Sequence, residues 1–214
     1  MKKIRIKFET SGLARFISHL DLNRVMQYAL RRSDIPVWYT EGFNSHLYVT
    51  FSNPLSLGFL NKCGIMEIKV TDDNYDASLA AAVLNKCLPE SITAVESYES
   101  DRKFTEIAFS DYLIEFDSAD GEAIEKAMRK SELIAVKKGK AGEYEINLAP
   151  HVKGLKCEYN GSRSSFFVRL PATVEFSINP GLLLDTAVKS CDMETSHRII
   201  TRLELLDKEG KLFR

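Results

Sequence analysis

Residues 3–32, KIRIKFETSGLARFISHLDLNRVMQYALRR, decide the fold, because their hydrophobic period changes part-way along. Apolar and basic residues alternate over residues 3–9, and this period of two predicts a half-buried strand with a basic open face. Residues 18–32 then follow a helical period, whose core-facing stripe is Leu22, Val25, Met26, Ala29 and Leu30. Ser18 fits the N-cap of this helix, and Pro36 disfavours its continuation.

The rest of the first half supplies three further strands and a second helix. Strand patterns cover residues 37–51 around a turn, 65–71 and 92–98, and an alanine-rich helical pattern covers 74–87. The resulting order over residues 1–99 is β-α-β-β-α-β, the ferredoxin-like order.

The order of elements repeats after a polar link at residues 100–103. Strand patterns lie at 107–116, 132–138, 143–149, 165–170 and 197–206, and helical patterns lie at 120–130 and from Pro180 onward. A segment rich in Gly, Lys and Ser near 150–163 is predicted to be an inserted loop. We therefore expect an α+β protein of two ferredoxin-like βαββαβ subdomains packed together, 1–99 with a basic first helix and 104–214 with the inserted loop.

Composition excludes several classes of protein. Hydrophobic residues make up 44% of the 214, which is typical of globular chains, and no stretch approaches the roughly 20 apolar residues of a membrane span. The basic N-terminus lacks the apolar run of a signal peptide, so we expect a cytoplasmic protein with no membrane partner. Cys63, Cys87, Cys157 and Cys191 are far apart, and no CxxC, GxGxxG or GxxxxGK[ST] motif occurs, so we expect no metal and no cofactor.

Charge is unevenly distributed along the chain. Residues 1–60 hold eight Lys or Arg and four Asp or Glu, a local charge of +4 in a protein of net charge −1. Such a sector favours a local anionic partner, and interleaved aromatic residues favour RNA. The predicted RNA-binding residues are Lys3, Arg5, Lys7, Arg15, Ser18, His19, Arg24, Tyr28, Arg31, Arg32, Phe43, Asn44 and His46. The alternative is a solvated basic face.

Three residues are candidates for catalysis. His19 falls in the first turn of the predicted helix, where an anion can bind. Glu41 and His46 flank the turn Gly42-Phe43-Asn44 and could form an acid/base pair. A purely structural turn with a glycine chosen for its backbone explains the same residues, and spacing does not separate the two interpretations.

The chain resembles a known bacterial family through several segments. The segments are RFISHLDL at 15–22, Arg24, ALRR at 29–32, EGFN at 41–44, His46, Phe51, Pro54-Leu55, Gly58, EINLAP at 145–150, NPGLL at 179–183 and ITR at 200–202. They resemble the radical-SAM-linked domain of unknown function, which is found alone or fused behind a radical SAM enzyme. This resemblance implies RNA- or ribosome-related work beside a radical SAM protein.

Three functions remain open. The leading hypothesis is a non-catalytic module that binds RNA or presents a substrate to a radical SAM enzyme. The second is a metal-independent RNA-processing endonuclease that uses His19 or His46. The third is an adaptor that binds only protein.

Overall fold

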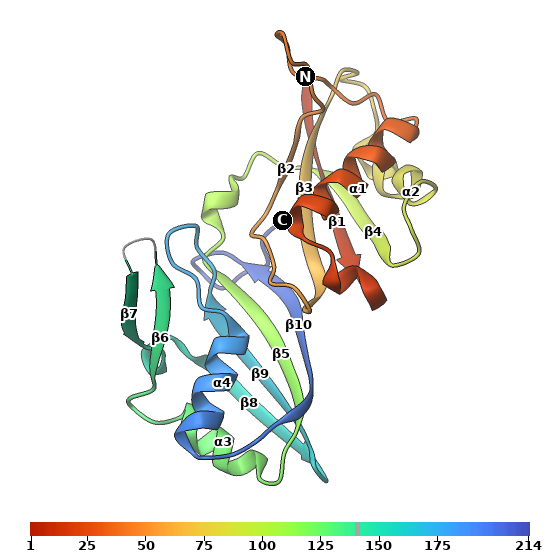
Figure 1. Cartoon of the computed structure of the whole chain (residues 1–214). Coiled ribbons are helices and arrows are strands. Elements are labelled where there is room, and N and C mark those ends of the chain that lie inside the picture. Colours follow the sequence, from red (N-terminus) through yellow and green to blue (C-terminus); the bar gives the residue numbers. More distant parts are fainter. Residues whose placement is uncertain (140–141) are drawn as a thin grey trace. The chain divides into compact units, whose positions relative to one another are not determined.

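The computed structural model describes residues 1–139 and 142–214, which divide into two compact units (Figure 1). Unit 1 comprises Met1–Phe104 with Arg214, and unit 2 comprises Thr105–Phe213. The sequence predicted a polar link at 100–103, just before the observed boundary. The α+β class expected from the sequence is confirmed.

Unit 1 has the β-α-β-β-α-β order. Its elements are β1 (Lys2–Thr10), the 3-10 turn η1 (Gly12–Phe16), α1 (His19–Arg32), β2 (Val49–Phe51), β3 (Leu60–Val70), η2 (Ala77–Leu79), α2 (Ala80–Asn85) and β4 (Ile92–Glu99). The strands lie in the order β4-β1-β3-β2, and every neighbouring pair is antiparallel. This is the arrangement of a ferredoxin-like unit.

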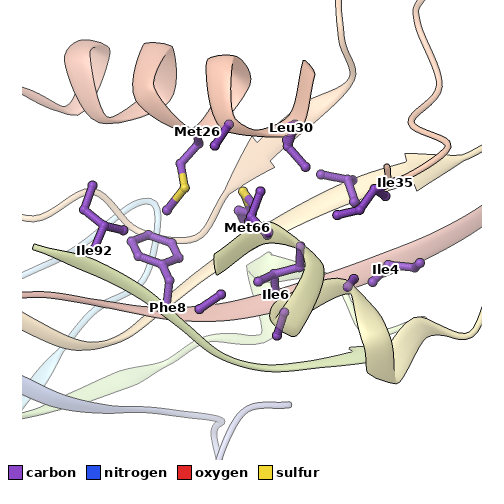
Figure 2. Close-up of a cluster of buried hydrophobic side chains, with 14 of the residues drawn as sticks. Ile4, Ile6, Phe8, Met26, Leu30, Ile35, Met66 and Ile92 are labelled. Atoms are coloured by element: carbon purple, nitrogen blue, oxygen red, sulfur yellow. The ribbon is translucent and has the colours of Figure 1, made fainter. Parts of the chain in front are cut away.

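Period-two alternation in β1 builds the core of unit 1. Ile4, Ile6 and Phe8 point to one face of the sheet and are buried there. Figure 2 shows Met26 and Leu30 of α1 directed toward these side chains. The apolar stripe predicted on this helix is therefore the surface that packs on the sheet, and the opposite face of α1 is left to solvent.

The ends of α1 follow the signals in the sequence. The Ser18 hydroxyl accepts a hydrogen bond from the Asp21 amide at 3.1 Å, as an N-cap should. The helix ends at Arg32, where Ser33 adopts an extended backbone and Ile35 is buried. Short polar side chains thus fix where α1 begins and ends.

Unit 2 repeats the arrangement with a hairpin added. Its elements are β5 (Phe109–Asp117), α3 (Gly121–Met128), β6 (Ile134–Gly139), β7 (Gly142–Asn147), η4 (Ala149–His151), β8 (Lys153–Asn160), β9 (Arg163–Pro171), α4 (Pro180–Ser190) and β10 (Ser196–Leu206). A sheet in the order β10-β5-β9-β8 is covered by α3 and α4, while β6 and β7 form a separate two-stranded sheet. The rings of Phe116 and Phe166 pack edge to face in the core, with their centroids 5.0 Å apart.

The prediction of an inserted loop near 150–163 is wrong. That segment contains β8, which pairs with β9 as an edge strand of the sheet. The insertion is instead the hairpin β6–β7, which contacts α4. The edge strand escaped prediction because most of its residues are exposed and polar or glycine, as is common where strands must resist pairing with another chain.

In the described part of the chain, no helix has the length and hydropathy needed to span a membrane.

Candidate nucleic-acid interface

The β1 face does not offer the open basic surface predicted for Lys3, Arg5 and Lys7. Arg5 is completely buried, and its Nη2 lies 3.4 Å from Oε2 of Glu67, its partner across the sheet. Lys3 also reaches Glu67, at 3.1 Å, and Lys7 is half-buried. A carboxylate therefore neutralises much of this face, and Arg5 is unavailable to a ligand.

Further contacts fix Arg5 in place. Its Nη1 donates to the Ser100 hydroxyl at 2.9 Å, and Nη2 donates to the Arg102 carbonyl. The guanidinium lies 4.7 Å above the Phe104 ring. These neutral acceptors and the ring face satisfy a buried cation, so Arg5 belongs to the internal structure of unit 1.

The solvent side of α1 does present the predicted mixture of basic and aromatic groups. Four exposed residues of α1 are spaced three or four positions apart and so form one stripe along the helix. We call this surface the α1 stripe; its residues are Leu20, Arg24, Tyr28 and Arg31. Tyr28 is 62% exposed, and the Arg31 guanidinium lies 6.0 Å from the centroid of its ring. A flat ring and neighbouring cations are the groups that bind bases and phosphates of single strands.

The arginines of α1 differ in their partners. Arg24 forms an exposed ion pair with Asp21 at 3.0 Å. The hydrogen bond from the Ser18 hydroxyl, and after it the Arg24 guanidinium, lowers the pKa of Asp21. Within residues 1–139 and 142–214, neither Arg31 nor Arg32 has an acidic partner, and Arg32 donates only to the Cys87 carbonyl at 3.4 Å. The C-terminal half of α1 thus carries uncompensated positive charge.

The predicted residues at and just before the start of α1 are less accessible to a ligand than expected. Ser18 is occupied with capping, and Arg15 is half-buried with its guanidinium 4.7 Å above the Phe16 ring. His19 is exposed, and its ring packs edge to face with that of Phe51, with the two ring centroids 5.3 Å apart. Of the three, His19 is the one whose side chain can reach a ligand freely.

The turn at 41–46 holds the second group of predicted residues. Gly42 has a φ of 114°, a backbone conformation that favours glycine, and Phe43 is fully exposed beyond it. His46 Nδ1 lies 3.1 Å from the Asn44 carbonyl oxygen, a contact that holds the ring against the turn.

The predicted acid/base pair of Glu41 and His46 is not formed. The Nδ1 of His46 also lies 3.0 Å from the Thr40 hydroxyl, and in the described chain no hydrogen bond or ion pair joins His46 or His19 to a carboxylate. The three candidates for catalysis therefore stay separate exposed groups.

An exposed apolar patch beside α1 was not singled out from the sequence. Leu13, Phe16, Leu20 and Leu57 are between 57% and 81% exposed. The Gly58 amide donates to the Arg15 carbonyl at 2.7 Å, which brings residues 57–58 against η1. Leu13 and Leu57 lie outside regular periodic stretches, so only their exposure in the folded chain identifies this patch.

A polar cluster in unit 2 was also missed. Asp117 Oδ2 lies 3.0 Å from His197 Nδ1, and its other oxygen accepts from Arg163 at 3.1 Å. Arg163 also donates to the His197 carbonyl at 2.9 Å, and the hydrogen bond from Arg163, followed by that from His197, lowers the pKa of Asp117. These residues come from the ends of β5, β9 and β10, so no sequence spacing links them. The cluster joins the three strand ends.

Comparison with known proteins gives a family. The family described as "Uncharacterized protein conserved in bacteria (DUF2344)" matches residues 3–180. The chain belongs to this family. The match includes α1 and the turn at 41–46, so the DUF2344 family covers the whole candidate interface. No curated protein matches the chain.

One solved structure agrees with the fold of this DUF2344 chain. A chain of the crystal structure of a Cbf5-Nop10-Gar1 complex matches with a TM-score of 0.53 and 10% identity, over 94% of this chain and 48% of that one. The DUF2344 chain thus spans about half of that chain's length. An unknown protein from Galdieria sulphuraria is 11% identical, with a TM-score of 0.27 over 94% of this chain and 98% of that one. At 10% identity, the likeness to the chain of the Cbf5-Nop10-Gar1 complex concerns the fold alone.

Proposed function

We propose that this protein is a non-catalytic module that binds single-stranded RNA through the α1 stripe. The observation that carries the proposal is the exposure of Tyr28 between arginines, on a helix whose other face is buried in the core. Base stacking on an aromatic ring and phosphate contacts from neighbouring arginines are the usual means of holding a single strand. The exposed Phe43 and His46 offer further contacts from the turn at 41–46.

The module works in the proposal as an accessory to a radical SAM enzyme that modifies RNA or a ribosomal substrate. This part rests on the sequence resemblance described above. An exposed surface for the enzyme is available in the apolar patch of Leu13, Phe16, Leu20 and Leu57, which shares Leu20 with the α1 stripe. Apolar patches of this kind commonly mark protein-binding sites.

The salt dependence of binding tests the role of the α1 stripe. Arg24 and Arg31 are seven residues apart, or about 10 Å along the helix at its rise of ~1.5 Å per residue. Both can therefore follow one RNA backbone. The plot of log affinity against log salt has a negative slope, and each phosphate-binding side chain that is removed from a single-strand binder makes it about 0.7 less steep. Arg24→Ala/Arg31→Ala should therefore flatten the slope by about 1.4.

The control removes the same charge from elsewhere. Lys126 and Lys130 are exposed on and just after α3 in unit 2, and Lys126→Ala/Lys130→Ala should leave the slope as in the wild type. Affinity of the arginine variant should fall equally for RNAs of different sequence, because phosphate contacts carry no sequence information. Equal slopes for both double variants, or no RNA binding by the wild type at low salt, would refute the proposal.

The apolar patch favours a second candidate function, an adaptor that binds only protein. Under this alternative, Leu13→Ser/Leu57→Ser abolishes capture of a radical SAM partner, and the wild type binds no RNA. Purification at low salt followed by the absorbance ratio at 260 and 280 nm distinguishes the two, because only the RNA-binding module retains nucleic acid.

A further inference from the structure

A groove runs along the C-terminal half of α1. One wall is formed by Val25, Tyr28, Ala29 and Arg32 of the helix, and the other by residues 87–89 after α2. Its volume of about 420 Å³ is within the range of small-ligand sites. The hydrogen bond of 3.4 Å from Arg32 to the Cys87 carbonyl ties the two walls together.

The groove combines apolar walls with positive charge at its edge. Val25, Ala29, Leu88 and Pro89 supply aliphatic surface, and the Tyr28 ring stands exposed above them. Arg31 lies against this ring, and Arg31 and Arg32 lack acidic partners among the residues that the structure describes. An occupant should therefore be flat and apolar in one part and anionic in the adjoining part.

We propose that the groove takes one unstacked nucleobase of single-stranded RNA, with the base on the Tyr28 ring and its flanking phosphate at Arg31 and Arg32. The inference rests on the proposed function and adds the place where a base is held. A base needs an apolar slot beside a ring, and its phosphate needs a cation within a few ångströms. A neutral apolar peptide would satisfy the walls and leave the two arginines without counter-charge.

Binding of fluorescein-labelled (U)12 at low salt tests this site. Tyr28→Ala should weaken binding by about 5- to 150-fold, the effect of removing one stacking ring. Tyr28→Phe keeps the ring and should bind like the wild type. Tyr144→Ala removes an exposed tyrosine from β7 of unit 2 and should also bind like the wild type. Because Tyr28 is exposed, its removal leaves the core of unit 1 intact.

Alkylation of Cys87 gives a second readout at the groove itself. Saturating (U)12 should slow the reaction of the half-buried Cys87 with iodoacetamide, while Cys191 of unit 2 should react at its unliganded rate. Equal RNA affinity of Tyr28→Ala and Tyr144→Ala, or a Cys87 that RNA does not protect, would refute the proposal that the groove holds a base. The salt dependence of the Arg24→Ala/Arg31→Ala variant would then still support RNA binding by the α1 stripe. Absence of any binding at low salt overturns both proposals.

Discussion

Removal of Glu67 should destabilise unit 1 strongly, because it removes a buried carboxylate that pairs with a buried arginine. The Arg5 and Glu67 side chains are 1% and 7% exposed, and their closest charged atoms are 3.4 Å apart. Breaking such a buried pair by removing one partner costs about 3–5 kcal/mol. Arg5 keeps its bonds to Ser100 and Arg102, so Glu67→Ala should lower the free energy of unfolding by about 3 kcal/mol, the lower end of this range.

Urea denaturation followed by Trp38 fluorescence measures this destabilisation directly, because Trp38 is the single tryptophan and lies in unit 1. The midpoint of thermal unfolding should fall by about 6–12 °C. The matched control within unit 1 is Glu9→Ala, which breaks the ion pair with the exposed Lys62 and should cost less than about 1 kcal/mol.

A double replacement separates burial from charge pairing. Arg5→Met/Glu67→Leu removes both charges and should recover most of the stability, because apolar residues of similar volume replace many buried ion pairs at little cost. If Glu67→Ala costs no more than Glu9→Ala, then Arg5 is not a buried cation that depends on Glu67, and the open basic strand face becomes possible again.

Three further outcomes follow from other sites. Gly64→Ala should destabilise unit 1 by about 1–3 kcal/mol in the same urea assay, because the new Cβ would lie 2.5 Å from the Phe8 ring. Cys157 should alkylate slowly at pH 8, because burial, and then the Glu125 carboxylate, raises the pKa of its thiol to about 12; Glu125→Gln should speed the reaction, as read by mass spectrometry. The pKa of Asp117 is lowered in the folded state, so the ionised Asp117 stabilises the fold above its ordinary pKa of 3.8, and this contribution is lost as the pH falls below that value. The free energy of unfolding of Asp117→Asn should therefore depend less on pH in that range than that of the wild type.

The candidate interface was predictable only where a helix face was involved. Arg24, Tyr28 and Arg31 share a face through their spacing alone, and the structure exposes them together. The alternation along β1 likewise placed Arg5 on the same strand face as Lys3 and Lys7, but the prediction that this face is open to a ligand was wrong. Alternation says which face of a sheet a side chain is on but does not say what covers that face.

The sequence by itself determined the order of the elements in unit 1, the core stripes of β1 and α1 and the capped start of α1, because periodicity and capping depend on residues close together in the chain. Only the tertiary structure decided that Arg5 is buried against Glu67, sixty-two residues away. It also decided that β8 is a strand, since an exposed edge strand is held by hydrogen bonds to β9 and needs little apolar pattern of its own. The groove between Tyr28 and Cys87 likewise exists only once α1 and the residues after α2 meet. Such contacts join distant segments, and no local pattern in the chain records them.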